Sequence, residues 1–253
     1  FGGRLPAPNL KTLAGLTNYV EEHGCDIGIA TDGDADRLGV IDDKAEFLHP
    51  NKILVLLYYY LMRYRGWRGA AVRNLATTHL LDRIAEDFGE TCYEVPVGFK
   101  YVSAKMVETG AIIGGESSGG LTVRGHIQGK DGIYAATLLV EAIAKTGRRL
   151  SALWDEITQK YGAAEMAEHD FHFSSAERTR IFKLLMEDKQ LPEFPCEIAK
   201  VSYMDGCKVY FKNGGWVIAR FSGTEQLLRV FCEMDTMENA EKIAKILTEF
   251  LSL

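Results

Sequence analysis

AAVRNLATTHLLDRIAEDFGETCYEVPVGFKYVSAKMVETGAII, residues 70–113, alternates short apolar runs with amphipathic segments. The pattern predicts strands at 70–73, 91–95 and 111–113, separated by helices at 78–88 and 103–108. Strands that alternate with helices in this way indicate a parallel, doubly wound α/β sheet. We therefore expect an α/β domain with a parallel or mixed sheet in this part of the chain.

A helix and two strands are predicted before this stretch. Asn9 is a suitable helix cap, apolar residues recur after it at helical spacing, and Gly24 can end the helix. Residues 27–30 and 38–41 are short apolar runs, which are typical of strands. We expect residues 1–45 to be the C-terminal remnant of another α/β domain.

The pattern changes at Gly162. Beyond it, consecutive strands are flanked by helices, which indicates a separate α+β domain. The predicted elements are strands at 168–173, 197–201, 207–211, 216–220 and 229–233, with helices at 176–186 and 237–251. We therefore expect an α/β domain at residues 46–163 and a smaller α+β domain at residues 164–253.

Composition limits the class of protein. The chain has 253 residues, 47% hydrophobic and 25% charged, as in globular proteins with a buried core. Its formal net charge of −6 argues against nucleic acid or an anionic membrane as the main partner. The longest apolar run, residues 53–62, is too short to cross a bilayer. Five scattered cysteines without a C-x-x-C pair indicate reduced thiols and a cytoplasmic protein.

The run Thr31-Asp32-Gly33-Asp34-Ala35-Asp36-Arg37 places three carboxylates at alternate positions directly after a predicted strand. Carboxylates this close repel one another unless a cation lies among them. Mg²⁺ prefers oxygen ligands and often shares one or two carboxylates with a substrate phosphate. We predict a Mg²⁺ site with Asp32, Asp34 and Asp36 as ligands, and a solvated acidic turn is the alternative.

Two other kinds of protein with a D-x-D-x-D pattern can be compared with this run. A calcium EF-hand requires Gly at its sixth position and Glu at its twelfth, where this chain has Arg37 and Asp43. The EF-hand interpretation therefore fails. A phosphatase that uses the first aspartate as nucleophile also places it after a buried strand, and that alternative stays open.

Residues 113–120, IGGESSGG, leave a short predicted strand and enter a glycine-rich turn. Glycine lets the backbone approach a ligand closely, and Glu116 and Ser118 offer the acceptor and donor groups that bind vicinal sugar hydroxyls. Lys100 follows the strand predicted at 91–95, and ligands of open α/β sheets bind at such carboxyl ends. A tight turn and a surface lysine are the plainer interpretations.

A third loop, Arg220-Phe221-Ser222-Gly223-Thr224-Glu225, follows a strand predicted in the C-terminal region. Successive backbone N–H groups in such a loop can form an anion-binding nest. The guanidinium of Arg220 adds a planar fork that suits phosphate oxygens. The alternative is a β-turn with a capping hydroxyl.

Together these loops resemble the α-D-phosphohexomutases, the family that includes phosphoglucomutase and phosphomannomutase. Residues 31–37 resemble the family's magnesium loop D-G-D-x-D-R, residues 115–119 its sugar-recognition loop G-E-x-S-G, and residues 220–225 its phosphate-binding loop R-x-S-G-T-E. Residues 97–100 (VGFK) and 126–133 (HIQGKDGI) are similar to the phosphoglucomutase branch. The order and spacing of the loops agree with the family over essentially the whole chain.

The resemblance implies a mutase that interconverts hexose 1-phosphate and hexose 6-phosphate through a phosphoserine and a hexose 1,6-bisphosphate intermediate. In the family pattern Mg²⁺ binds the three aspartates, while Arg37 and Lys100 offset negative charge. The residues that would bind the sugar hydroxyls are Glu116, Ser118 and Gly119. The residues that would bind the phosphate that is not transferred are Arg220, Ser222, Gly223 and Thr224.

The serine that carries the phosphoryl group in this family lies in the first of four domains. Its motif, of the type T-x-S-H-N-P, is not found in this sequence, and residues 77–80 (TTHL) resemble it only superficially. The chain begins FGGRLP, and we expect it to comprise the end of domain two followed by domains three and four.

The implied partners are therefore hexose phosphates and the N-terminal domains of the same polypeptide. The chain alone is expected to be inactive as a mutase. A non-catalytic module that binds Mg²⁺ and sugar phosphates is the first alternative, and a D-x-D phosphatase is the second.

Overall fold

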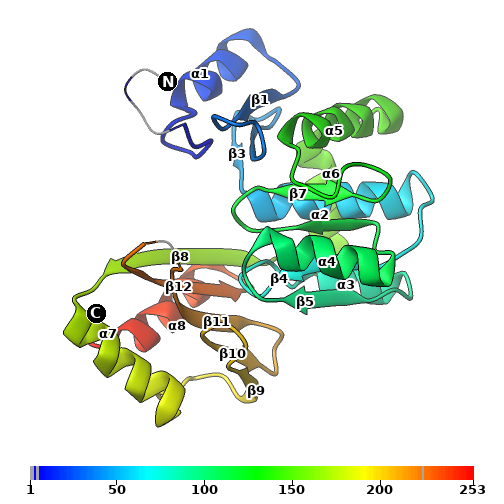
Figure 1. Ribbon diagram of the computed structural model, residues 1–253. Coiled ribbons are helices and arrows are strands. Elements are labelled where there is room, and N and C mark those ends of the chain that lie inside the picture. The colour runs from blue at the N-terminus through cyan, green and yellow to red at the C-terminus, as the bar shows by residue number, and fades with distance from the viewer. Residues whose placement is uncertain (1–2, 4–5, 224) are drawn as a thin grey trace. The chain divides into compact units, whose positions relative to one another are not determined.

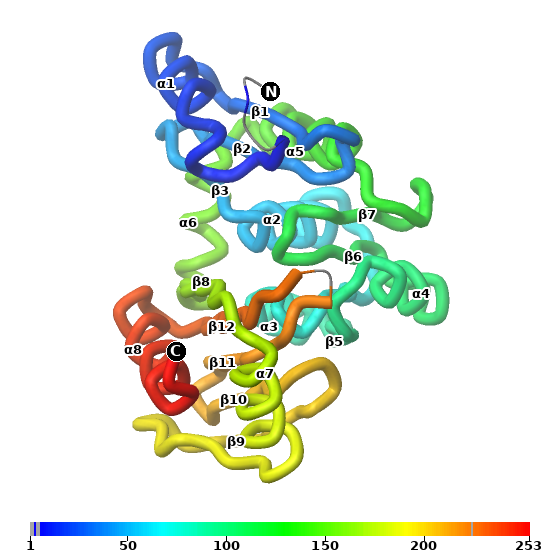
Figure 2. The backbone as a smooth tube through the Cα atoms, turned by 60° about the vertical axis from the view of Figure 1, so that its left-hand side comes forward, coloured from blue at the N-terminus to red at the C-terminus, as the bar shows by residue number. Residues whose placement is uncertain are grey.

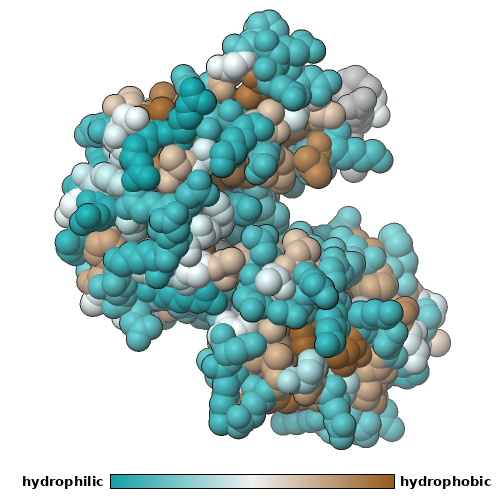
Figure 3. Space-filling model, turned by 180° about the vertical axis from the view of Figure 1, so that it is seen from behind, coloured by the Kyte–Doolittle hydropathy of each residue, from teal (hydrophilic) through white to brown (hydrophobic). Residues whose placement is uncertain are grey.

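The computed structural model describes residue 3, residues 6–223 and residues 225–253. The chain divides into two compact units, Phe1–Tyr161 and Gly162–Leu253, which are described separately below (Figure 1). The face seen in Figure 3 is mainly hydrophilic, with apolar residues in small patches. Within the described residues, every helix is too short or too polar to cross a membrane.

The first unit begins with one helix and a small antiparallel sheet. The helix is α1 (Ala14–His23), and the strands are β1 (Gly28–Thr31), β2 (Leu38–Ile41) and β3 (Phe47–Leu48). Strands β1 and β2 pair antiparallel over their whole length, so the acidic run connects the two strands of a hairpin. Val20 of α1 packs with Ile41 in a small core beneath this hairpin.

Helix α1 begins later than the sequence pattern predicts. Instead of capping it, Asn9 accepts a hydrogen bond from the Thr12 N–H (3.0 Å), and its own N–H donates to the Thr12 hydroxyl (3.0 Å). This reciprocal pair closes a separate turn, and the helix starts only at Ala14. The predicted end is confirmed, because Gly24 is the left-handed cap with φ +61°.

A four-stranded mixed sheet forms the centre of the first unit. Its strands are β4 (Ala71–Asn74), β5 (Cys92–Val95), β6 (Ile113–Gly115) and β7 (Leu121–Val123), in the spatial order β5-β4-β6-β7. Strand β4 pairs parallel with both β5 and β6, and β7 pairs antiparallel with β6. The predicted mixed α/β sheet is confirmed, and the antiparallel strand at its edge was not predicted.

Five helices accompany this sheet. They are α2 (Pro50–Arg63), α3 (Leu80–Asp87), α4 (Phe99–Thr109), α5 (Gly132–Thr146) and α6 (Leu150–Tyr161). The chain moves from β4 to β5 through α3 and then back past β4 to β6 through α4. Right-handed crossovers in opposite directions place α3 and α4 on opposite faces of the sheet, and Figure 1 shows α4 in front. Helix α5 lies beside β1 and β2 (Figure 2).

The structure differs from the sequence prediction at the start of helix α4 and at the end of strand β6. Helix α4 begins at Phe99 rather than at residue 103, because Gly98 (φ +131°) turns the chain and the Phe99 ring packs against the core. Strand β6 includes both Gly114 and Gly115. A Cβ at Gly114 would lie 2.6 Å from the Val102 side chain, so this glycine lets α4 pack on the sheet. Packing of α4 against the sheet is thus sufficient to account for the absence of a side chain at Gly114.

The second unit is a five-stranded antiparallel sheet covered by helices. Its elements are β8 (Glu165–His172), α7 (Ser175–Phe182), the π-helical segment η1 (Lys183–Glu187), β9 (Ile198–Ser202), β10 (Cys207–Phe211), β11 (Trp216–Phe221), β12 (Leu227–Met234) and α8 (Met237–Phe250). The strand order is β8-β12-β11-β10-β9, with antiparallel pairing between all neighbours. This confirms the α+β class, although the helix predicted at 176–186 changes to a π-helix at Lys183.

Candidate active site

The acidic loop, residues 32–37, brings its three aspartates together. Asp32 is buried, Asp34 is exposed, and Asp36 is half-buried, and one carboxylate oxygen of each lies within 4.8 Å of the others. Ala35 adopts a left-handed conformation (φ +59°), which is uncommon for a residue other than glycine. The loop therefore turns tightly enough for the carboxylates to face a common point.

Asp32 is fixed by hydrogen bonds inside the loop. Its Oδ1 accepts the N–H groups of Asp36 and Arg37 (3.1 Å each), and its Oδ2 accepts Nε–H of Arg37 (2.5 Å). Burial alone would raise the pKa of Asp32, but the hydrogen bonds and charge of Arg37 outweigh it and lower that pKa. Asp32 is therefore ionised and correctly oriented before any ligand arrives.

Asp36 faces one cation from outside the loop and one from within it. Its Oδ2 forms an ion pair with Nζ of Lys130, and Nε of Arg37 lies 3.8 Å from its Oδ1. Two side-chain cations thus offset the repulsion among the three carboxylates. A carboxylate has about four lone-pair sites, so these contacts leave oxygen acceptors for a metal. The set of three aspartate oxygens at one point fits a hard cation such as Mg²⁺.

The acidic loop is joined to the predicted sugar loop. Arg37 forms an isolated antiparallel bridge with Gly120, and the N–H of Leu38 donates to the carbonyl of Gly119 (3.4 Å). The N–H of Gly132, at the start of α5, donates to the carbonyl of Ala35 (2.9 Å). These contacts join residues 35–38, residues 119–120 and Gly132, which are far apart in the sequence. We call this junction the loop seam.

The predicted sugar loop, residues 115–119, forms a closed turn together with Gly120. The N–H of Glu116 donates to the Gly120 carbonyl (3.0 Å), the N–H of Gly119 donates to the Glu116 carbonyl (3.1 Å), and Gly119 has φ +100°. The Glu116 side chain is buried, whereas Ser118 is exposed at the tip. The tight turn considered as an alternative is therefore present, and it carries the two predicted sugar-binding side chains.

Partners of Glu116 were missed in the sequence. Its Oε1 accepts hydrogen bonds from Nδ2 of Asn74 (3.1 Å) and from the N–H of Gly98 (3.0 Å). The N–H of Ser117 donates to the Thr77 hydroxyl (3.0 Å). Asn74 ends β4, and a polar residue at the end of a buried strand was the available signal for it.

Lys130 was also absent from the predicted site residues, although it lies in the motif at residues 126–133. Asp131 next to it caps α5: its Oδ1 accepts the N–H of Tyr134 (2.8 Å), and its Oδ2 pairs with Nε2 of His126 (2.8 Å). The Tyr134 N–H first, and then His126, lower the pKa of Asp131. The His126 ring stacks on Tyr134 with a centroid distance of 3.9 Å. This capped helix start holds Lys130 in place.

Lys100 lies in the first turn of α4 and is exposed. Lys100 therefore follows β5 as predicted, but in helix α4, which begins earlier than expected, and its role at the site stays a prediction. Its Nζ lies 4.9 Å from the centre of the Tyr101 ring. Gly98, two residues earlier, donates to Glu116, so Lys100 stands close in sequence to a group that contacts the sugar loop.

The predicted phosphate loop lies in the second unit, between β11 and β12. Nε of Arg220 donates to Oδ2 of Asp205 (2.9 Å). The N–H of Ser222 donates to the Leu227 carbonyl (2.8 Å), and the Ser222 hydroxyl accepts the N–H of Glu225 (3.3 Å). Gly223 is exposed, and Thr224 lies outside the described residues.

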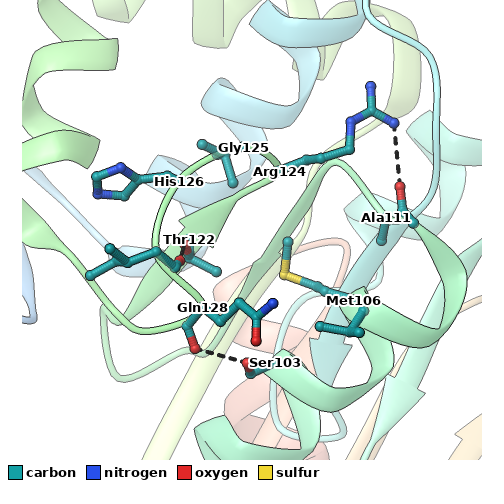
Figure 4. Close-up of a pocket in the computed structure, with 12 residues that line it drawn as sticks. Ser103, Met106, Ala111, Thr122, Arg124, Gly125, His126 and Gln128 are labelled. Atoms are coloured by element: carbon teal, nitrogen blue, oxygen red, sulfur yellow. Dashed lines mark hydrogen bonds between the residues drawn. The ribbon is translucent and has the colours of Figure 1, made fainter.

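One cavity of about 260 Å³ lies between α4 and residues 122–128 (Figure 4). The Ser103 hydroxyl donates to the Gln128 carbonyl (2.8 Å) at one end, and Arg124 donates to the Gly110 carbonyl (3.3 Å) at the other. The His126 ring points away from the cavity (Figure 4). The described lining residues include none of the predicted site residues, so we place the candidate site at the loop seam.

Comparison with known proteins identifies the family. The description "Phosphoglucomutase/phosphomannomutase, alpha/beta/alpha domain II" matches residues 1–45, "alpha/beta/alpha domain III" matches residues 49–161, and the C-terminal domain of the same family matches residues 182–250. The chain belongs to the phosphoglucomutase/phosphomannomutase, or α-D-phosphohexomutase, family.

Individual relatives agree with this assignment. A phosphoglucomutase/phosphomannomutase of Thermococcus kodakarensis is 33% identical over 246 residues, covering 97% of this chain and 51% of the relative. A probable phosphoglucosamine mutase of Methanosarcina barkeri is 33% identical over 253 residues, with 97% and 54% covered. The crystal structure of a putative phosphomannomutase from Thermus thermophilus superposes with a TM-score of 0.81 at 30% identity, covering 100% of this chain and 52% of that one. The chain thus spans about half the length of these relatives.

Proposed function

We propose that this chain supplies the metal, sugar and phosphate sites of a phosphohexomutase that interconverts hexose 1-phosphate and hexose 6-phosphate. The observation that carries the proposal is the seam in the first unit. There, an acidic loop suited to Mg²⁺ is bonded directly to a turn that presents a buried carboxylate and an exposed hydroxyl. Such an arrangement suits a ligand with sugar hydroxyls beside a phosphoryl group.

The residues have distinct roles in this proposal. Glu116 accepts hydrogen bonds from sugar hydroxyls, and Ser118 and Gly119 also bind the sugar. Arg37 and Lys100 offset negative charge on the transferring phosphoryl group. The phosphate that is not transferred is bound by Arg220, Ser222, Gly223 and Thr224.

The chemistry itself is positioning and charge stabilisation, as in phosphoryl transfer generally. Mg²⁺ held by Asp32, Asp34 and Asp36 would supply positive charge to the transferring group. The phosphoserine and the hexose 1,6-bisphosphate belong to the family mechanism, and the serine is proposed to lie outside these 253 residues. The chain alone is accordingly proposed to bind hexose phosphates without isomerising them.

Two measurements on the purified chain test this proposal. Titration calorimetry with Mg²⁺ present should detect glucose 1-phosphate binding and much weaker binding of free glucose. A coupled assay for glucose 6-phosphate, with glucose 1,6-bisphosphate added, should show no turnover above background. Turnover that disappears in Ser118→Ala would show that the nucleophile lies in the sugar loop, and the proposed role of Ser118 would then be wrong.

In a D-x-D phosphatase Asp32 would have to be the nucleophile, and the contacts of Asp32 argue against that function. Both carboxylate oxygens of Asp32 accept hydrogen bonds from Arg37 or Asp36, and the shortest of these is 2.5 Å. An oxygen held in this way is a poor nucleophile toward phosphorus. Release of inorganic phosphate from glucose 1-phosphate by this chain would reverse this preference.

A further inference from the structure

The segment after β4 contains a buried hydrogen-bond network that none of the proposed roles uses. Asn74 and Thr77 are 2% and 0% exposed, respectively. Oδ1 of Asn74 accepts the N–H of Ala76 (2.9 Å) and the hydroxyl of Thr77 (2.8 Å). Because a backbone N–H can only donate, these bonds fix Oδ1 on that side and leave the amide NH₂ facing Glu116.

Both side chains of this network end on the sugar loop. Nδ2 of Asn74 donates to Oε1 of Glu116 (3.1 Å), where the N–H of Gly98 also donates (3.0 Å). The hydroxyl of Thr77 accepts the N–H of Ser117 (3.0 Å). Hydrogen bonds to a buried carboxylate are stronger than neutral ones, so these donors hold the carboxylate as well as orient it.

The network connects the ends of all three parallel strands. Asn74 ends β4 and Thr77 follows it, Gly98 follows β5, and Glu116 with Ser117 follows β6. The chain reverses its direction across the sheet at this point, because β5 and β6 lie on opposite sides of β4. Ligands of open α/β sheets bind at such a reversal.

We propose that Asn74 and Thr77 are positioning residues for recognition of the hexose. They orient Glu116 and fix the backbone next to Ser118, so that these two groups meet vicinal ring hydroxyls. This inference rests on the proposed function and deepens it, because it assigns the sugar end of the substrate to this network. The phosphate end does not depend on it.

Adjacent threonines provide a matched pair of variants. The Thr78 hydroxyl is also buried and accepts one backbone N–H, that of Leu80 (3.1 Å), but this bond lies at the start of α3 and does not contact the sugar loop. Thr77→Val and Thr78→Val therefore remove the same buried hydroxyl group. Only Thr77→Val loses bonds of the network, to Ser117 and Asn74, whereas Thr78→Val loses the bond to Leu80. Thr77→Ser restores the hydroxyl.

The experiment is titration of the whole chain and its variants with glucose 1-phosphate and, separately, with inorganic phosphate. Thr77→Val removes the hydrogen bonds to Ser117 and Asn74, so it should weaken glucose 1-phosphate binding at least about fivefold and leave inorganic phosphate binding unchanged. Thr77→Ser should recover binding to within about twofold, and Thr78→Val should stay within about twofold while its melting temperature falls. If Thr77→Val does not fold, Asn74→Asp tests the same network by placing a carboxylate oxygen against Glu116.

The outcomes separate this inference from the function on which it rests. Unchanged glucose 1-phosphate affinity in Thr77→Val, with binding lost in Glu116→Ala, would overturn the positioning role alone. Equal weakening by Thr77→Val and Thr78→Val would show general loosening and would also overturn it. No glucose 1-phosphate binding by the parent chain would overturn the proposed function together with this inference.

Discussion

The acidic loop and the phosphate loop hold their charged groups by different means. The acidic loop depends on Gly120, Lys130 and Gly132, which come from distant parts of the sequence. The phosphate loop is a hairpin connection closed by Leu227, its near neighbour, with Asp205 bonded to the arginine. Both loops connect the strands of a hairpin, but the acidic loop is held in addition by these tertiary contacts, whereas the phosphate loop is held mainly by its own strands. Mutations at the two loops should therefore have effects of different kinds.

The largest expected effect is on binding at the phosphate loop. Arg220→Ala should weaken glucose 6-phosphate binding by about 1.5–3 kcal/mol, the range for hydrogen bonds to charged groups. Titration calorimetry measures this loss. Arg178→Ala is the control, because it removes an exposed cation that stacks on Phe221 beside the same loop. Equal affinity of Arg220→Ala and the parent would exclude this loop from the site.

A pair of glycine substitutions tests the difference between the loops directly. A Cβ at Gly132 would lie 2.9 Å from the carbonyl oxygen of Arg37, whereas a Cβ at Gly223 would meet no atom within 4 Å. Gly132→Ala should lower the free energy of unfolding by about 1–3 kcal/mol, despite the higher helix propensity of alanine. Gly223→Ala should stay within about 0.5 kcal/mol. Chemical denaturation measures both, and similar small changes would mean that the seam is not tightly packed.

Removal of one acidic-loop carboxylate should affect metal binding more than folding. Asp34 is exposed, so Asp34→Asn keeps the fold while replacing one negative ligand. Affinity for Mg²⁺ should fall at least about tenfold, equivalent to about 1.4 kcal/mol. Calorimetric titration of Mg²⁺ measures it, with Asp26→Asn as a control at an exposed carboxylate outside the loop. Unchanged affinity would place the metal elsewhere.

The smallest expected effect concerns acid and the start of α5. Hydrogen bonds from Tyr134 and His126 lower the pKa of Asp131 below 3.8. Protons therefore bind the unfolded chain more tightly, and the stabilisation by this carboxylate is present above pH 3.8 and lost as the pH falls through the folded pKa. Because Asp131 is partly exposed, the loss should not exceed about 1 kcal/mol.

Thermal unfolding of the parent chain and of Asp131→Asn between about pH 3 and pH 7 measures this contribution. Asparagine keeps the capping oxygen but cannot ionise. The difference in melting temperature should shrink as the pH falls from about 5 towards 3. A difference that stays constant throughout this range would contradict the assigned cause.

Some features of this site were predictable from the sequence and others were not, and the difference has physical reasons. The clustering of Asp32, Asp34 and Asp36 was predictable because the three alternate within seven residues, and metal binding by them stays a prediction. Strands β4, β5 and β6 were predictable from apolar runs, with shifts of a few residues at most, whereas the short edge strand β7 was missed. The contacts of Lys130 with Asp36 and of Asn74 with Glu116 were not predictable, because an ion pair or a hydrogen bond between distant segments leaves no periodic pattern.

The glycines of residues 113–120 also show what the sequence can predict and what it cannot. Gly114 and Gly115 belong to a glycine-rich run that suggested ligand contact, yet both lie inside β6. Only Gly119 of this run has the left-handed conformation that the turn needs (φ +100°). Sequence cannot separate a glycine that makes room for a neighbouring helix from one that permits a turn, because both require only the absence of a side chain.

The seam also sets an order of events during synthesis. A ribosome makes the chain from its N-terminus at roughly 5–20 residues per second, so the acidic loop emerges seconds before the residues that hold it. Until Gly120 and Gly132 arrive, Arg37 is the one cation within the loop itself, and the three carboxylates have no partner at Lys130. We therefore expect the hairpin of β1 and β2 to become ordered only after most of the first unit has left the ribosome.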